Sequence, residues 1–320
     1  MNVLTQLEPI ITFAVFYFCI LVLGSTSGIF SERAGIVNIA IAGFMVFGAT
    51  MYLLSSYVVS NVILDQDGGS EWLQIPLTIV AVLLTALFSL LFGFSTIKLK
   101  SDQTISGFAI NILATGIATL MMFVLVSLQG SFSFELYGRN ELALSGSPMK
   151  FGNILSFKTF VTVLIVFFSW FAIRKTRWGL RFRAIGENPQ AADVAGINVN
   201  KIKWEAIIIA GSIAGTAGAF FAQTQTAIFS NTYDTNGFGF LALAIMITSR
   251  WRVSLSVVIS LVFSFLLSFS FNGNNLSSNQ ALLGFLKVIP YTATLVIMVL
   301  TSKNSAGPAA AGIPYDKSKR

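Results

Sequence analysis

Few residues in this chain could carry out chemistry, and those that could are mostly uncharged amides. The sequence contains no histidine, and its single cysteine, Cys19, lies inside an apolar run. Without histidine the chain lacks the commonest general base and the commonest metal ligand, so we expect neither a catalytic site nor a metal site. One cysteine also excludes a disulfide within the chain. These residue types favour handling of a solute over catalysis.

Four amides lie in or beside long apolar runs, where a polar solute could meet them: Asn38, Asn111, Gln223 and Gln225. An amide side chain both donates and accepts hydrogen bonds, so each could hold a neutral polar solute on a central path. Each could instead join two packed helices through a hydrogen bond. The sequence leaves both interpretations open.

Small residues accompany these amides at helical spacing. They share a face with Asn111 in the run 104–129. In the run 204–228, small-xxx-small pairs are formed among Ala210, Gly211, Ala214, Gly215, Gly218 and Ala222. Small residues let helices approach closely, so we interpret these stripes first as packing surfaces.

The composition places these runs in a membrane. Hydrophobic residues make up 55% of the chain and charged residues only 10%, less than half the share of about 25% in soluble domains. We predict an all-α, polytopic membrane protein with about nine or ten transmembrane segments, one or two of them broken or half-length. The predicted spans are residues 9–29, 36–58, 75–97, 104–129, 153–172, 204–228, 237–249, 253–271 and 281–302.

Two of these spans are expected to be irregular. The run 237–249 is too short to cross a membrane as a straight helix. If Lys98 lies on the cytoplasmic side, counting the loops back from it places the N-terminus outside and gives nine spans. A cytoplasmic N-terminus would need one more crossing, most easily made by a break in the run 36–58 at Gly43 or Gly48. We expect the turn 231–236 on the outer face, and no Asp, Glu, His or Arg near the middle of a predicted span.

The longest polar interval, Ala172–Lys203, contains seven basic and two acidic residues. Basic loops stay on the cytoplasmic side, so this loop, 173–203, should face the cytoplasm. Asn188 can cap a helix, Pro189 suits its first position, and Gly196 suits the left-handed residue after its end. A short capped helix here could enter a partner's socket or lie at the lipid headgroups.

Five stretches resemble a known family: SERAGIVNIAIAGFMVFGAT (31–50), QTISGFAINILATG (103–116), RAIGENPQAADVAGINVNKIKWEAIIIAGSIAGTAGAFF (183–221), GFGFLALAIMITSRW (237–251) and PAAAGIPYDK (308–317). These stretches, taken in their order along the chain, are similar to the permease subunits of ABC importers. The resemblance is strongest to the BMP-type nucleoside importers, which are related to the ribose and branched-chain amino-acid permeases. The resemblance implies one permease domain over 1–302, a cytoplasmic tail over 303–320, and a multi-pass location in the plasma membrane.

The resemblance also implies partners and cargo. A separate cytoplasmic ABC ATPase would bind ATP and magnesium, so this chain would need no cofactor and would not be an enzyme. A second, non-identical permease would share the path, a substrate-binding lipoprotein would deliver the solute, and membrane lipid would surround the spans. Nucleosides are the implied cargo, with ribose-like sugars as the alternative; nucleic acid is not implied, because the basic residues flank membrane spans.

By the same resemblance, the loop would act as a coupling helix seated in the ATPase. The residues implied in that contact are Gly186, Glu187, Asn188, Pro189, Ala191, Ala192, Asp193 and Gly196. One position departs from the family pattern, which usually reads Asn-Ile-Gly-x-Glu-Gly: here Ala42 stands where the glutamate is usual. We expect this difference to affect substrate identity more than the importer role.

A secondary carrier or channel for a neutral polar solute remains the alternative from another class. Ion-driven carriers usually place charged residues within the membrane to bind the coupling ion, and the predicted spans show none near their middle. The chain also lacks a GxxxxGK[ST] phosphate loop, so any ATP hydrolysis would belong to another chain. Dependence of uptake on ATP rather than on an ion gradient distinguishes the two classes.

Overall fold

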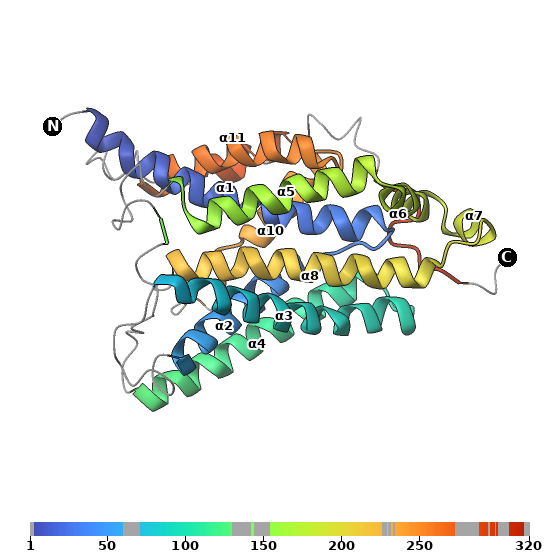
Figure 1. Ribbon diagram of the computed structural model, residues 1–320, viewed down its shortest axis with the longest axis horizontal. Helices are drawn as coiled ribbons and strands as arrows, with labels where there is room; N and C mark the ends of the chain where they lie inside the picture. Colours follow the sequence, from blue (N-terminus) through green and yellow to red (C-terminus); the bar gives the residue numbers. More distant parts are fainter. Residues whose placement is uncertain are drawn as a thin grey trace.

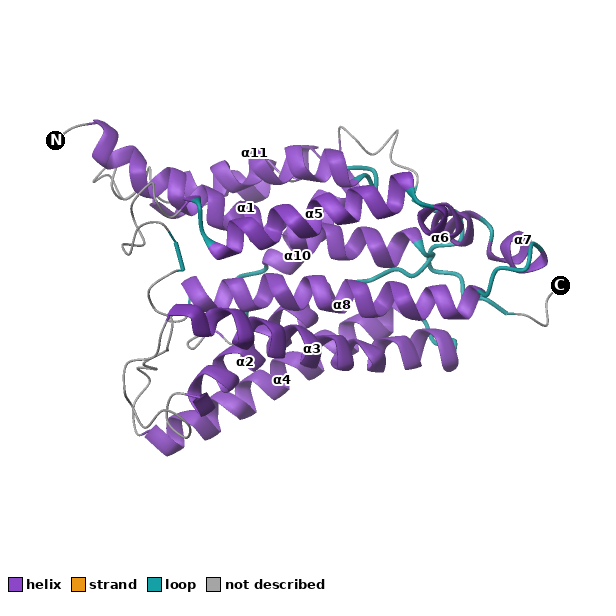
Figure 2. Cartoon of the chain, in the orientation of Figure 1, coloured by secondary structure: helices purple, strands orange, loops and turns teal. Residues whose placement is uncertain are grey.

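The chain forms a bundle of roughly parallel and antiparallel helices in a computed structural model (Figures 1 and 2). The structure describes residues 3–59, 71–129, 142–143, 154–225, 229, 232, 234–272, 288–293, 295–297, 299 and 307–316. Its elements are α1 (Val3–Arg33), α2 (Ile41–Val58), η2 (Glu71–Leu73), α3 (Gln74–Gly93), η3 (Phe94–Lys98), α4 (Gln103–Gln129), α5 (Phe157–Lys175), α6 (Arg177–Glu187), α7 (Pro189–Val194), α8 (Val199–Thr224), α10 (Phe238–Thr248) and α11 (Val253–Asn272). Within these ranges the fold is helical, as predicted.

Seven helices of the described chain are long and apolar enough to cross a membrane: Leu7–Arg33, Ile41–Val58, Glu71–Lys98, Gln103–Leu125, Phe157–Lys175, Val199–Thr224 and Val253–Phe271. Two shorter apolar helices, Phe238–Thr248 and Val288–Ile297, add to them. The all-α polytopic prediction is therefore confirmed. Most of each expected loop (59–74, 130–152 and 272–280), and much of 281–302 and 303–320, lies outside the described residues.

Helix α8 lies at the centre of the bundle, and α1, α2 and α3 pack around it. Its small-residue stripe makes this possible. A Cβ at Gly48 of α2 would come within 2.6 Å of the carbonyl oxygen of Gly215, and one at Gly218 within 1.9 Å of the carbonyl oxygen of Met45. Backbones this close leave no room for a side chain, so the packing interpretation of the α8 stripe is confirmed.

Helices α2 and α10 are the irregular elements. The break in the first of them lies before α2, not inside it as predicted. The chain leaves α1 at Arg33, runs without helix through 36–38, and begins α2 at Ile41. The expected break at Gly43 or Gly48 is wrong, because α2 continues through both glycines. Their small size serves contacts instead: Gly48 meets α8, and Gly43 meets α4.

The two ends of the bundle carry different elements. Helices α6 and α7 and the C-terminal segment 307–316 gather at one end, whereas α1 begins at the opposite end (Figure 1). A chain that begins and ends on opposite sides crosses an odd number of times, which agrees with the nine-span count rather than with ten.

Candidate functional site

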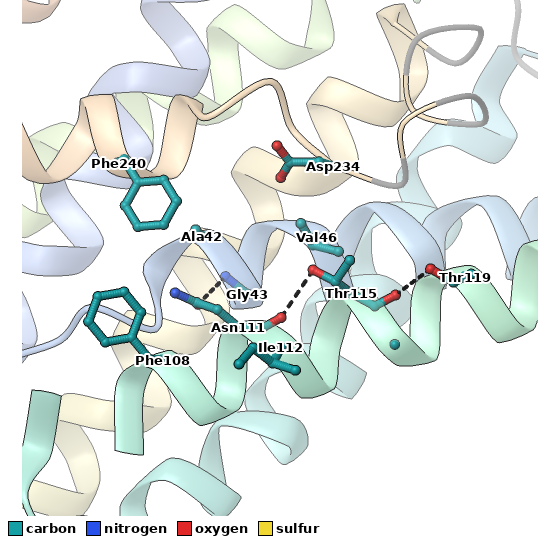
Figure 3. Close-up of a pocket in the computed structure, with 11 residues that line it drawn as sticks. Ala42, Gly43, Val46, Phe108, Asn111, Ile112, Thr115, Thr119, Asp234 and Phe240 are labelled. Atoms are coloured by element: carbon teal, nitrogen blue, oxygen red, sulfur yellow. Dashed lines mark hydrogen bonds between the residues drawn. The ribbon is translucent and has the colours of Figure 1, made fainter. Parts of the chain in front are cut away.

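A pocket of about 500 Å³ lies where α2 and α10 begin (Figure 3). Helix α10 has 11 residues, so it rises only about 16 Å, roughly half the 30 Å thickness of a bilayer core. It ends beside Arg250 and Arg252, so its first residues lie deep within the bundle. Gly239 there lies against Ala42 of α2, since a Cβ on that glycine would come within 2.4 Å of the Ala42 Cα. The pocket is thus formed by helix starts inside the membrane.

Three helices and one connection line this pocket. The lining residues are Ala42, Gly43 and Val46 of α2, Phe108, Asn111, Ile112, Thr115, Gly116 and Thr119 of α4, Phe240 of α10, and Asp234 between α8 and α10. Small-molecule sites in proteins usually have volumes of about 300–1,000 Å³, with an apolar lining and a few polar groups. In size and lining the pocket fits a small organic solute.

Asn111 both lines the pocket and holds α2 in place. Its Oδ1 accepts a hydrogen bond of 2.7 Å from the backbone N–H of Gly43, and its Nδ2 donates one of 3.0 Å to the carbonyl of Ile39. The first residues of a helix have backbone N–H groups without partners in that helix. The Asn111 amide therefore serves as a cap supplied by α4 and fixes where α2 starts.

The other three predicted path residues do not line this pocket. Asn38 is fully buried in the turn before α2, and neither its amide nitrogen nor its amide oxygen has a hydrogen-bond partner. Gln223 donates from Nε2 to the Thr78 hydroxyl of α3 at 3.0 Å, which ties α8 to α3. Gln225, half-buried, ends α8. Of the four amides, only Asn111 lies on the pocket wall.

Sequence reasoning missed several polar and aromatic groups of this pocket. Asp234 was expected in an outer turn, but it lines the pocket with Thr115, which lies halfway along α4. The short run 237–249 contained the signal: a half-length helix that ends at one face of the membrane must start midway across, so the residues before it also lie at depth. Phe108 and Phe240 were missed because an aromatic ring within an apolar span resembles any other core residue.

The pocket is open on the side of α4. Phe108 and Phe240 are each 49% exposed and Ile112 is 74% exposed, and Thr115 and Thr119 are also exposed. A carboxylate in the bilayer centre costs about 2.5–3.5 kcal/mol on insertion scales. Lipid is therefore a poor neighbour for a wall that holds Asp234 and two hydroxyls, and this wall requires water or another protein beside it.

The basic loop folds as two helices at one end of the bundle (Figure 1). The predicted short helix is α7, with Pro189 in its first turn. The Asn188 side chain accepts a hydrogen bond of 3.0 Å from the Ala191 N–H, and Gly196 has a φ of +81°. These local features are confirmed. The preceding α6 was not predicted; Thr176 caps it, and its Phe182 and Ile185 are buried.

The predicted coupling residues occupy different environments. Val194 is 77% exposed and is the most exposed large apolar side chain in the described part of the chain; it shares the exposed surface of α7 with Gln190 and Ala191. Ala192 is only 4% exposed and faces the bundle. Glu187, Asn188 and Gly196 are exposed, Pro189 and Asp193 are half-buried, and Gly186 is buried.

The segment 307–316 connects this loop to the rest of the bundle. The Ala310 N–H donates to the carbonyl of Gly186 in α6 at 2.9 Å. Asp316 forms an ion pair of 2.9 Å with Lys100, next to the start of α4. At the same end, the Trp251 indole donates to the Glu32 carboxylate, and the Arg33 Nε donates to the carbonyl of Trp251. The ends of α1, α6, α10 and α4 are therefore linked.

Helices that span a membrane around a pocket built on half-length helices are typical of solute transporters. Comparison with known proteins identifies the class. The family described as "Branched-chain amino acid transport system / permease component" matches residues 10–300. This chain belongs to that family, and it is a permease subunit of the ABC transporter type rather than an enzyme.

Two relatives match over the whole length of both chains. The nucleoside ABC transporter permease protein NupC of Lactococcus lactis subsp. cremoris (strain MG1363) is 33% identical over 327 residues. The guanosine ABC transporter permease protein NupQ of Bacillus subtilis (strain 168) is 32% identical over 329 residues. The putative glucose ABC transporter permease protein TsgC13 of Haloferax volcanii is 30% identical over 264 residues, 81% of this chain and 75% of that protein. No solved structure matches the chain.

Proposed function

We propose that this chain is the permease subunit of an ATP-driven importer for nucleosides. The observation that carries the proposal is similarity over the full length to permeases named for nucleoside and guanosine transport. The pocket between α2, α4 and α10 supports it, because a neutral nucleoside needs a cavity that offers both apolar surface and hydrogen-bonding groups. Ribose-like sugars are the alternative cargo, favoured by the similarity to a putative glucose permease.

The loop formed by α6 and α7 would couple a cytoplasmic ATPase to this bundle. Helix α7 presents Val194, Ala191 and Gln190 outward, as a small docking helix requires. Helix α6 is fixed behind it: the Trp178 indole donates to the Glu205 carboxylate of α8 at 2.9 Å, and Phe182 packs edge-on against Phe30 of α1. A displacement of α7 by the ATPase would therefore also move α1 and α8.

A second, non-identical permease would cover the open side of the pocket. The exposed wall of α4 lies at mid-membrane depth beside Asp234, and a carboxylate there is costly to leave against lipid. A partner permease packed there would enclose a path between the two chains. A substrate-binding lipoprotein would deliver the solute at the end opposite α7, with the C-terminus in the cytoplasm.

The direct test is uptake of labelled uridine and guanosine by the assembled importer in vesicles, with and without ATP. We expect accumulation that requires ATP and persists when ion gradients are abolished. Uptake of ribose but of neither nucleoside would show that the cargo is a sugar. Accumulation driven by an ion gradient without the ATPase would overturn the importer role.

The coupling role is tested with Val194→Arg, because Val194 is exposed whereas Ala192 is buried. We expect loss of uptake and of ATPase co-purification, with normal insertion in the membrane. The matched control is Ile313→Arg, at a 61% exposed apolar residue in the C-terminal segment at the same end of the bundle. Normal uptake by Val194→Arg would exclude α7 from the contact with the ATPase.

A further inference from the structure

We infer that the pocket between α2, α4 and α10 recognises the two halves of a ribonucleoside separately, with Asp234 binding the ribose hydroxyls and Phe108 and Phe240 contacting the base. This inference rests on the proposed cargo and assigns the residues that select it. It concerns groups on the pocket wall that the amide-based sequence prediction did not include.

The Asp234 carboxylate is placed to accept hydrogen bonds from a ligand. Its Oδ2 accepts from the backbone N–H of Gly237 at 3.2 Å, which fixes the side chain at the start of α10. A carboxylate has about four acceptor positions, so one backbone donor leaves most of its capacity for other donors. Figure 3 shows the carboxylate turned toward the space above Ala42 and Val46. The neighbouring hydroxyls of a ribose supply two O–H donors at a spacing that one carboxylate can bridge.

Other polar groups of the pocket are less available. The Asn111 amide is occupied by Gly43 and Ile39, and the hydroxyls of Thr115 and Thr119 donate to carbonyls one turn earlier in α4. These hydroxyls can still accept a hydrogen bond, but a hydroxyl-rich solute mainly needs strong acceptors. Asp234 is the only charged residue among the described residues that line the pocket.

The two phenylalanine rings offer the surface that a base requires. Phe108 comes from α4 and Phe240 from α10, both half-exposed at the pocket, and Figure 3 shows them on the side of the pocket away from Thr119. Bases stack favourably on aromatic side chains in nucleic-acid complexes, whatever the base. Rings at one side and a carboxylate at the other match a molecule with a flat half and a hydroxylated half.

The test compares maximal uptake rates of uridine and 2′,3′-dideoxyuridine by the assembled importer at saturating concentrations. The delivery protein is the same in every sample, so a changed ratio of rates belongs to this chain. Asp234→Asn keeps an acceptor for the Gly237 N–H but removes the charge. A hydrogen bond to a charged group is stronger than one to a neutral group, so we expect the preference for uridine to fall roughly tenfold.

The matched control is Asp102→Asn. Asp102 likewise accepts from the backbone N–H three residues further on, that of Ile105, at 2.9 Å, but it lies at the start of α4 away from the pocket. We expect it to keep the wild-type ratio. An unchanged ratio in Asp234→Asn, with uridine still carried, would overturn the inference and leave the nucleoside cargo intact. Absence of nucleoside uptake by the wild-type importer would instead refute the proposal that the cargo is a nucleoside.

The rings are tested with Phe240→Leu and Phe108→Leu. We expect each to lower the maximal rate for uridine several-fold while leaving any ribose uptake unchanged, because ribose has no base. Phe123→Leu is the control, since Phe123 is a 72% exposed ring on α4 that does not line the pocket. Equal losses for uridine and ribose, or for Phe123→Leu and Phe240→Leu, would contradict the assignment of the rings to the base.

Discussion

Helices α4 and α8 contain similar residue types but have opposite surroundings. Both are long apolar helices with glycines and threonines spaced along them, yet 78% of the most apolar window in α8 is buried, against 28% in α4. In α8 the small residues meet backbone or side chains of α2 and α3. In α4 one face packs on α2 through Gly107 and Asn111, whereas Thr115, Gly116 and Thr119 stay exposed beside the pocket.

This difference shows that a stripe of small residues has no fixed meaning in a membrane helix. Close approach is useful only where a second backbone is present to fill the space. In α8 neighbours are present on nearly all sides. In α4 one side has no neighbour within the described part of this chain, and the same residue types there form the wall of a cavity.

The largest effect is expected for Gly218→Val in α8. Its Cβ would overlap the carbonyl oxygen of Met45, 1.9 Å away, and a backbone atom of α2 cannot move aside as a side chain can. We expect a loss of more than about 3 kcal/mol, above the usual range for overpacking. Gel filtration in detergent should show little folded protein. A stable Gly218→Val protein would refute the close α2–α8 contact.

The amides of the two helices give the next comparison. Asn111→Leu in α4 leaves the Gly43 N–H and the Ile39 carbonyl without this partner, which we expect to cost about 1–3 kcal/mol. Gln223→Leu in α8 removes a bond to the Thr78 hydroxyl and one with the Tyr52 hydroxyl, but leaves every backbone hydrogen bond in place. Thermal unfolding should therefore show the larger loss for Asn111→Leu. Equal losses would mean that Asn111 does not hold the start of α2.

One threonine in each helix extends the comparison of α4 and α8 to solute uptake. Thr115 in α4 and Thr216 in α8 each donate to a carbonyl one turn earlier, at 3.1 and 2.9 Å, but only Thr115 lines the pocket. Removing one neutral hydrogen bond is worth about 1 kcal/mol, so Thr115→Val should lower the apparent affinity for the solute roughly fivefold in uptake assays. Thr216→Val should leave uptake unchanged. A reversed result would move the solute path from α4 to α8.

The smallest effect is expected for Gly116→Ala in α4. No atom lies within 4 Å of the position of its Cβ, and alanine favours helix over glycine by up to about 1 kcal/mol. We expect stability to stay the same or rise slightly, in contrast to Gly218→Val. A clear loss of thermal stability would indicate that this side of α4 is packed against something.

Part of the candidate site could be read from the sequence. The caps of α7 were predictable because Asn188, Pro189 and Gly196 act through contacts within a few residues. The pocket was not, because Asn111 meets Gly43 across 68 positions in the chain and Asp234 reaches Thr115 across more than a hundred. The break before α2 was misplaced for the same reason: a cap supplied by another helix leaves no mark near Ile41.

Residue types and their short-range spacing are enough to predict a set of apolar helices in a membrane with a basic, capped loop. Those features depend on apolar length, charge and local capping, which are properties of neighbouring residues in the chain. The folded bundle was needed to show which small residues are packing surfaces, which amide is already occupied, and that Asp234 lies on the pocket wall. These depend on which helices become neighbours, and on the half-length α10 that brings a polar turn to mid-membrane depth.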